Sequence, residues 1–237
     1  ITAILDAGTF TSTDPLAKDF TFDSYQGEAN SQQLFQKLDV VNNKGELSLN
    51  FTTGAPKVVY GKLLVESAVS DDRGKFVTSQ AHADFLGVDR LVGLYNKDWL
   101  LTVGTPAAFQ YVVVDERGKP IAGTSVDIKV EHEVTKSARV KGAGNAYLTE
   151  YKTEWVRAGA CSGVSTAEPL NCSFTPEKSG SYRAVASIKD TKGADHVTTL
   201  GTYAVGSDYV VWDNGSDSSL SIIPQSTSYK IGETARY

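Results

Sequence analysis

Apolar and polar residues alternate with a period of two along several stretches of this chain. In an extended strand this period places every second side chain on the same face, so one face can be buried while the other meets water. The pattern is clearest in segments 46–51, 125–131 and 182–188. Their inward-facing residues are expected to be Leu47, Leu49 and Phe51 in the first, Val126, Ile128 and Val130 in the second, and Tyr182, Ala184, Ala186 and Ile188 in the third.

Turn sequences that end in glycine separate these stretches, and helical periodicity is scarce. Four such turns, each predicting a hairpin, occur at 43–45, 71–74, 115–118 and 190–193. Only residues 28–38 depart from the pattern, and their composition predicts a short helix or an ordered loop with Leu34, Phe35 and Leu38 turned inward. The chain is therefore expected to be all-β, built of tandem antiparallel β-sandwich modules of the fibronectin or immunoglobulin kind.

The length of 237 residues and the hydrophobic content of 41% suffice for about two domains. A fresh apolar run begins at Leu91, after the strands around the 71–74 turn, which places one boundary near 89–90. Polar, turn-rich sequence on both sides of Tyr209–Trp212 places another after residue 206. The predicted domains are a sandwich module at 1–89, a second at 90–206, and a linker with the first strands of a truncated third module at 207–237.

Composition also bears on partners. The formal net charge is −5 and lysine and arginine are scattered, so the basic surface that nucleic acids require is missing and no nucleic-acid partner is expected. No apolar run approaches the roughly 20 residues that cross a bilayer, so no membrane contact is expected within the chain. The sequence lacks methionine and ends where a new β-rich run begins, and we expect it to be a piece of a longer protein.

Two cysteines, Cys161 and Cys172, lie close together in a polar stretch. A disulfide between them would close a short loop, would stabilise the fold by roughly 3 kcal/mol, and would persist only in an oxidising compartment. The alternative is a pair of free thiols. A metal site is not expected here, because no histidine or further cysteine stands at ligand spacing.

No constellation of residues predicts catalysis. His82, His132 and His196 stand singly, without a nucleophile elbow or a helix with paired histidines nearby. We expect each to be a solvated or hydrogen-bonded strand residue. Glu131 and Glu133 flank His132, but strand alternation turns both glutamates to the opposite face, so a metal or acid–base cluster is not predicted.

The three tryptophans keep a binding role open, because exposed aromatic rings can stack on sugars. Trp99 precedes Leu100 and Leu101 and is expected in the core, whereas Trp155 and Trp212 could lie at a contact surface. The oxygen-rich stretch 213–217 lacks the downstream glutamate of a calcium loop and is interpreted as a solvated turn.

Several short motifs follow one another in the second part of the chain. They are VGLYNKDW (92–99), VGTP (103–106), VVVDERGKPIAG (112–123), CSFTP (172–176), GSYR (180–183), DTKG (190–193), IIP (222–224) and YKIGETAR (229–236). In this order they resemble macroglobulin-like domains of the bacterial alpha-2-macroglobulin family. The resemblance covers 91–237 well and 1–90 only in general pattern, and Ile231 departs from the proline usual there in the family.

The resemblance implies a role for the chain. In that family, macroglobulin-like domains form a rigid array around a protease-cleavable bait segment and a separate thioester domain, and cleavage of the bait leads to entrapment of the protease. The thioester needs a cysteine followed closely by Glu-Gln, whereas Cys161 is followed by Ser-Gly-Val and Cys172 by Ser-Phe-Thr. The resemblance therefore implies a scaffold segment that is not an enzyme and has no thioester, catalytic residue, metal or cofactor.

The expected function is thus that of a scaffold within a broad-range protease inhibitor. The implied partners are proteases trapped by the full-length parent, neighbouring domains of the same chain, and peptidoglycan-synthesis or other periplasmic proteins. The implied location is the periplasm, with the parent anchored to the inner membrane as a lipoprotein. The alternatives are immunoglobulin-like modules of a surface adhesin or carbohydrate-binding array, and an accessory domain of a glycoside-active protein.

Overall fold

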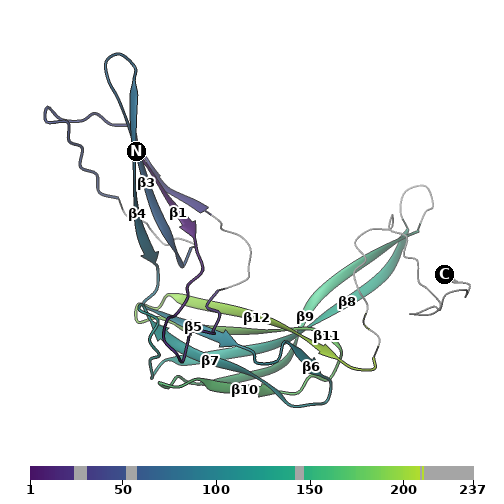
Figure 1. The fold of residues 1–237 in the computed structure, drawn as a ribbon. Coiled ribbons are helices and arrows are strands. Elements are labelled where there is room, and N and C mark those ends of the chain that lie inside the picture. The colour runs from purple at the N-terminus through teal and green to yellow at the C-terminus, as the bar shows by residue number, and fades with distance from the viewer. Residues whose placement is uncertain (24–30, 52–57, 142–146, 209, 211–237) are drawn as a thin grey trace, which may run out of the picture.

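The computed structural model describes residues 1–23, 31–51, 58–141, 147–208 and 210. All regular elements in this part of the chain are β-strands, arranged in three sheets (Figure 1). Every strand pair is antiparallel except the short pairing of β12 with β6, which is parallel. The all-β prediction is confirmed, and among the described residues no helix is long and apolar enough to cross a membrane.

The first sheet is formed by the N-terminal part of the chain, and we call it the N-terminal sheet. Its strands are β1 (Thr2–Ala7), β2 (Ser31–Gln36), β3 (Tyr60–Ser70) and β4 (Phe76–Leu86), in the spatial order β2-β1-β3-β4. The turn predicted at 71–74 joins β3 to β4, with Gly74 at a φ of 75°. This sheet stands at one end of the rest of the molecule (Figure 1).

The other two sheets face each other as a sandwich. The three-stranded sheet, in the order β10-β7-β5, contains β5 (Arg90–Tyr95), β7 (Ala107–Asp115) and β10 (Leu170–Phe174). The five-stranded sheet, in the order β6-β12-β11-β8-β9, contains β6 (Leu100–Thr102), β8 (Ser125–Lys141), β9 (Tyr147–Val164), β11 (Gly180–Lys189) and β12 (Asp195–Val205). The domain boundaries near 89–90 and 206–207 remain predictions.

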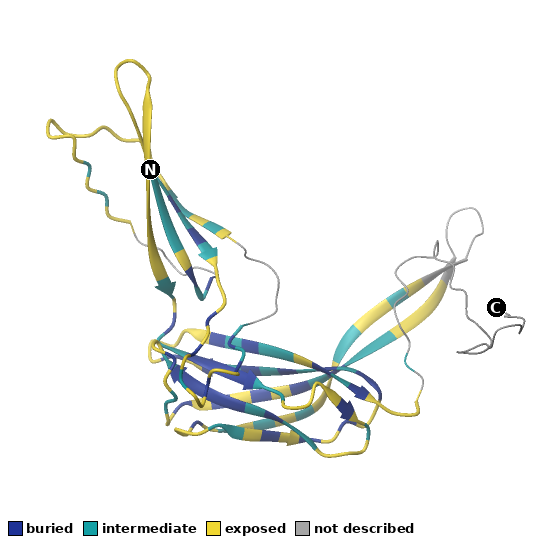
Figure 2. Cartoon of the chain, viewed as in Figure 1, coloured by how far each residue is buried: buried dark blue, intermediate teal, exposed yellow. Residues whose placement is uncertain are grey.

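The sandwich core contains the side chains that alternation turned inward. Val126, Ile128 and Val130 of β8 are buried in it, and so are Tyr182, Ala184, Ala186 and Ile188 of β11. In Figure 2 buried residues alternate with exposed ones along this part of β8 and with half-buried ones along β11. The two strand predictions for 125–131 and 182–188 are therefore confirmed.

Strands β8 and β9 continue beyond the sandwich as a two-stranded ribbon, which projects from the end opposite the N-terminal sheet (Figure 1). Residues 136–139 of β8 are exposed on this ribbon. Lys136 forms an ion pair with Glu154 across it, and the hydroxyls of Thr135 and Thr153 lie 3.0 Å apart. Polar cross-strand pairs of this kind hold the ribbon together where no core lies beneath it.

Two predictions of secondary structure are wrong. Residues 31–36 form strand β2 in place of a helix or loop, pairing with β1 through contacts such as Ala3 with Phe35. Leu34 and Phe35 are half-buried as expected, but Leu38 is 97% exposed. Glutamines fill the outward positions of this segment, so it lacks the β-branched residues that usually mark a strand.

The second wrong prediction is the strand at 46–51. The turn at 43–45 forms, with the Asn42 N–H bonded to the Glu46 carbonyl at 2.9 Å, but no strand follows it. Leu47 and Leu49 are half-buried, and Phe51 stacks on Phe35 with ring centroids 5.1 Å apart. Alternation identified the face that packs, but it could not supply the neighbouring strand that a ladder requires.

Candidate functional site

The N-terminal sheet is joined to the sandwich by a second apolar core, which lies outside the sandwich core. Segment 8–23 crosses from β1 onto the outer face of the three-stranded sheet, where its apolar residues meet Val112 and Val114 of β7. Tyr60 and Leu86 of the N-terminal sheet, and Val59 just before β3, pack against the same cluster. The buried members of this cluster, which we call the junction core, are Phe10, Ala17, Phe20, Phe22, Val88, Leu91, Val112 and Val114.

Phe22 is the most deeply placed aromatic residue of the junction core, with 1% of its surface exposed. Its ring makes an edge contact with Phe10 at a centroid distance of 5.3 Å, and Phe10 makes a second edge contact with Tyr60 of β3 at 5.2 Å. This aromatic chain runs from the sandwich to the N-terminal sheet. Edge-to-face pairs add to the stabilisation that burial of the rings provides.

Gly93 on β5 makes room for the Phe22 ring. A Cβ atom at this position would lie 2.6 Å from one ring carbon of Phe22 and 2.8 Å from another, well inside normal contact distance. The VG pair at 92–93 is thus explained by a close approach between a strand and a segment far away in the sequence. No sequence pattern could have identified the partner ring.

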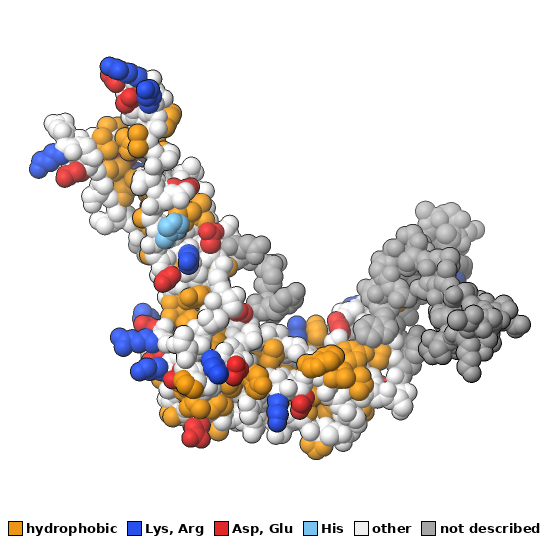
Figure 3. Space-filling model, viewed as in Figure 1, with side chains coloured by type: hydrophobic (Ala, Val, Ile, Leu, Met, Phe, Trp, Pro, Cys, Tyr) orange, Lys and Arg blue, Asp and Glu red, His pale blue; other side chains and the backbone are white. Residues whose placement is uncertain are grey.

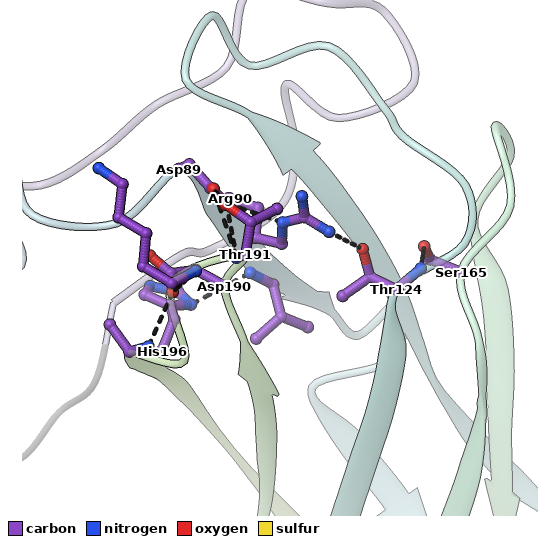
Figure 4. A network of polar contacts seen from close by, with 10 residues as sticks. Asp89, Arg90, Thr124, Ser165, Asp190, Thr191 and His196 are labelled. Carbon is purple, nitrogen blue, oxygen red and sulfur yellow. Dashed lines mark hydrogen bonds and ion pairs between the residues drawn. The ribbon is translucent and has the colours of Figure 1, made fainter.

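His196 holds segment 8–23 in place through hydrogen bonds. Its imidazole, labelled in Figure 4, is buried. Its Nδ1 accepts the Val92 N–H at 3.1 Å, and its Nε2 lies 3.1 Å from the Phe22 carbonyl oxygen, to which it donates. Burial lowers the pKa of His196 from 6.5 to about 4, with the Phe22 carbonyl acting in the opposite direction. The imidazole is therefore neutral at physiological pH and links segment 8–23, β5 and β12.

Further hydrogen bonds tie segment 8–23 to the sandwich. Thr21 and Leu94 exchange two backbone hydrogen bonds, each of 2.9 Å. The Ser12 hydroxyl donates to the Gly118 carbonyl at 2.6 Å, at the turn that follows β7. Each of these contacts joins residues that lie about 70 to 110 positions apart in the sequence, so segment 8–23 is held by parts of the chain far from it.

Asp89 and Arg90, at the connection from β4 to β5, are held by a polar network (Figure 4). The Asp89 carboxylate accepts hydrogen bonds from Thr191 and forms an ion pair of 2.8 Å with Arg90. The Thr191 hydroxyl, more than Arg90, lowers the pKa of Asp89. Arg90 also donates to the Thr124 hydroxyl at 2.9 Å. The residues at the predicted boundary are thus bonded to two separate turns of the sandwich.

The histidines do not form a reactive cluster. His132 is buried with its Nε2 3.1 Å from the Ser179 carbonyl oxygen, and His82 is exposed on β4. Glu131 accepts a hydrogen bond of 2.7 Å from Arg183, away from His132. Within the described part of the chain, no group of three or more acidic, histidine or cysteine side chains could hold a metal ion.

The tryptophan predictions need one correction. Trp99 is 76% exposed, not buried, because it lies in the bend before β6 and not in the strand itself. It borders a shallow hollow of about 150 Å³, whose other lining residues are Asp19, Thr21, Leu94, Tyr95, Asn96, Leu200 and Gly201. Trp155 is half-buried beneath the Arg183 guanidinium, which lies 4.2 Å from its ring centroid.

The two cysteines form a disulfide, with their Cα atoms 5.7 Å apart. Cys161 lies on β9, the edge of the five-stranded sheet, and Cys172 lies on β10, the edge of the three-stranded sheet. The bond therefore closes one open side of the sandwich. The predictions on Trp212, the turn at 213–217 and the motifs at 222–236 concern residues outside the described part of the chain.

Comparison with known proteins adds an independent line of support. The chain is 23% identical over 194 residues to an alpha-2-macroglobulin homolog from Nostoc sp. (strain PCC 7120), a match that covers 82% of this chain and 10% of the Nostoc protein. No family model matches the chain.

Solved structures give the same result. The native conformation of E. coli alpha-2-macroglobulin superimposes with a TM-score of 0.58 and 17% identity, covering 99% of this chain and 16% of that one. The bacterial alpha-2-macroglobulin resemblance is confirmed. E. coli alpha-2-macroglobulin activated by porcine elastase (TM-score 0.56, 17% identity, 88% and 18% covered) and the Salmonella alpha-2-macroglobulin reacted with methylamine (0.52, 14%, 86% and 14%) share the fold.

This chain spans about one tenth of the length of its Nostoc relative and about one sixth of the E. coli chain. The junction core is the part of the described structure that joins the N-terminal sheet to the sandwich.

Proposed function

We propose that this chain is a stiff scaffold segment of an alpha-2-macroglobulin-like protease inhibitor. The observation that carries the proposal is the continuous junction core, in which segment 8–23 bonds to the N-terminal sheet, β5 and β12 at once. A connection with a buried core and several buried hydrogen bonds resists bending, whereas a bare linker would not. In a protein that reacts to cleavage of one segment, such stiffness would transmit the change to other parts.

We assign the trapping of proteases to the longer parent protein and not to this chain alone. One of the E. coli relatives is described as activated by porcine elastase, and the present chain shares its fold. The proposal assigns this chain neither a catalytic group nor a thioester, because neither cysteine precedes a Glu-Gln pair and both are joined in the disulfide. The disulfide also favours an oxidising compartment, such as the bacterial periplasm, for the parent.

The proposal is tested by measuring stiffness and inhibition on the same purified chain. Spin labels on cysteines introduced at Lys62 of β3 and Lys129 of β8, both exposed, report the distance between the N-terminal sheet and the sandwich. We expect one narrow distance distribution. We also expect porcine elastase and trypsin to keep full activity on a protein substrate when the chain is added. A broad distribution, inhibition by the chain alone, or one early preferred cut inside it would contradict a scaffold role.

The exposed Trp99 supports a second candidate function, the binding of carbohydrate. An indole ring on the rim of a hollow that also has Tyr95, Asn96 and Asp19 offers both a stacking surface and polar groups to a sugar. If the chain acts in this way, a glycan array should give defined signals that the Trp99→Ala variant loses. The matched control is Trp155→Ala, which removes an indole from β9 and leaves the hollow intact. If the chain is only a scaffold, neither the wild-type chain nor either variant should give a glycan-array signal above background.

A further inference from the structure

Two aspartates lie at the predicted domain boundaries, and each is bonded to the sandwich in the same way. Asp89 directly precedes β5, and Asp208 follows the end of β12 by three positions. Each carboxylate accepts hydrogen bonds from both the backbone N–H and the side-chain hydroxyl of a single residue. We call the contact of Asp89 with Thr191 the entry clamp and the contact of Asp208 with Ser179 the exit clamp.

The two clamps lie at opposite ends of the same strand. Ser179 directly precedes β11, and Thr191 follows its last residue by two positions. β11 is the middle strand of the five-stranded sheet and pairs with β12 along its whole length. A strand of 10 residues spans about 33 Å. The chain is therefore tied to one end of this central strand where it enters the sandwich and to the other end where it leaves.

The exit clamp holds the chain beyond the end of the sheet. Pairing of β12 with β6 ends at Val205, and the Asp208 carboxylate then accepts the Ser179 N–H at 2.9 Å and the Ser179 hydroxyl at 2.5 Å. Gly206 permits this close approach, because a Cβ atom there would lie 2.8 Å from the Ser179 Oγ and 2.9 Å from the Asp208 Oδ1. A side chain at position 206 would push the chain away from Ser179.

The turn that receives Asp208 is itself fixed to the sandwich. Ser179 is buried, and its carbonyl oxygen lies 3.1 Å from the Nε2 of His132, which is also buried. The Tyr182 hydroxyl donates to the Lys178 carbonyl at 2.9 Å and accepts the Lys178 N–H at 3.2 Å. The turn is thus held from its inner side, so the exit clamp fixes the outgoing chain and not the turn.

The entry clamp uses a turn that is fixed in a similar way. Figure 4 shows Asp89 facing Thr191, whose N–H and hydroxyl both donate to its carboxylate. The turn around Thr191 is closed by Asp190, whose carboxylate accepts the N–H of Lys192 at 2.8 Å and that of Ala194 at 2.7 Å. The connection from β4 to β5 is therefore bonded to a preformed turn.

Both carboxylates act through these specific bonds. The hydroxyl of Ser179 lowers the pKa of Asp208, and the hydroxyl of Thr191 lowers that of Asp89. Both groups are therefore ionised near neutral pH, and hydrogen bonds to an ionised carboxylate are stronger than bonds between neutral groups. In Figure 3 acidic and basic side chains of the described residues are interspersed over the visible face. Local bonding, and not a broad field of one sign, distinguishes the two aspartates.

We propose that Asp89 and Asp208 are positioning residues that fix the directions in which the chain enters and leaves the sandwich. Two hydrogen bonds to one residue hold each connection at a defined angle, and β11 links the two anchoring turns through the middle of the sheet. The two directions are thereby fixed relative to each other. The inference does not depend on the scaffold proposal, since it rests on contacts at the ends of β11 and not on the junction core.

Spin-label distances test each clamp separately. Labels on cysteines introduced at Lys62 and Lys129 report the entry, and labels at Lys129 and Ser207 report the exit; all three positions are exposed. Each pair should give one narrow distance distribution in the otherwise wild-type chain. Asp89→Ala should broaden the entry distribution alone, and Asp208→Ala should broaden the exit distribution alone.

Amide hydrogen exchange, measured by NMR, reports the clamps directly. The Ser179 N–H should exchange about tenfold faster in Asp208→Ala, and the Thr191 N–H should do so in Asp89→Ala, because each loses a charged acceptor. Two further variants separate positioning from packing. Thr191→Ser keeps the hydroxyl and should leave the entry distribution narrow, whereas Thr191→Val keeps the shape without the hydroxyl and should broaden it.

Asp72→Ala is the matched control, because Asp72 is an exposed aspartate in the turn between β3 and β4 and should change neither distances nor exchange rates. Circular dichroism confirms that each variant is folded. An unchanged distribution in either Asp89→Ala or Asp208→Ala would overturn the proposal, and so would broadening of both distributions by one of these variants. An entry distribution that broadens in Phe22→Ala but not in Asp89→Ala would leave the scaffold proposal standing and overturn this one.

Discussion

Phe22→Ala is expected to lower the free energy of unfolding by about 3–5 kcal/mol, the range for truncation of a buried phenylalanine. The ring is 1% exposed, it packs on Phe10, and it fills the space that Gly93 leaves open. Its removal leaves a cavity between segment 8–23 and β5, and the rigid strand beneath cannot collapse to fill it. Denaturant unfolding followed by tryptophan fluorescence measures the loss.

The same substitution should also loosen the junction. With spin labels at Lys62 and Lys129, the distance distribution is expected to broaden in Phe22→Ala. Phe76→Ala is the matched control: it removes the same side chain from an exposed position on β4 and should change stability by less than about 0.5 kcal/mol. Equal losses in the two variants, or an unchanged narrow distribution in Phe22→Ala, would show that the junction core does not hold the sheet and the sandwich together.

Acidification is expected to weaken the junction through His196, with a loss of about 3 kcal/mol between pH 6.5 and about pH 4. Above pH 6.5 the imidazole is neutral in both the folded and the unfolded chain, so stability does not depend on it. Below pH 6.5 the unfolded chain binds a proton that the folded chain excludes, and the loss is complete near the folded pKa of about 4. Protonation of Nδ1 would set two donors against each other, because that atom accepts the Val92 N–H.

The nearby Asp23 opposes part of this effect. Burial raises the pKa of its carboxyl group, so the folded chain gains a proton there more readily than the unfolded chain as the pH falls. Unfolding of His196→Gln and Asp23→Asn, measured between about pH 7.5 and pH 4.5, separates the two groups. His196→Gln should lose most of the acid dependence, whereas Asp23→Asn should steepen it. A His196→Gln variant with the wild-type slope would assign the acid sensitivity to other groups.

If the junction behaves as these two experiments predict, the chain is stiff near neutral pH because one apolar core and one neutral imidazole act at the same place. Stiffness of this kind suits a segment that must hold parts of a larger protein at fixed positions.

The sequence by itself determined the strands that line the sandwich core. Alternation in 125–131 and 182–188 identified the buried faces correctly, because the period of two is a local property of an extended chain. The turn at 71–74 could also be predicted from the sequence, because the positive φ that Gly74 adopts is a local requirement of the turn. The order of the motifs at 92–123 and 172–193 was enough to reveal the resemblance to bacterial alpha-2-macroglobulins.

Only the tertiary structure decided how these strands are used. Residues 46–51 do not form the predicted strand, whereas residues 31–36 do form one. The reason is that a β-strand requires a neighbouring strand whose backbone can form hydrogen bonds with it. Trp99 turned outward although its neighbours are leucines. The junction was invisible in the sequence, since Phe22 meets Gly93 and His196 across long stretches of chain. Contacts between distant segments depend on how the whole chain folds, and no local pattern records them.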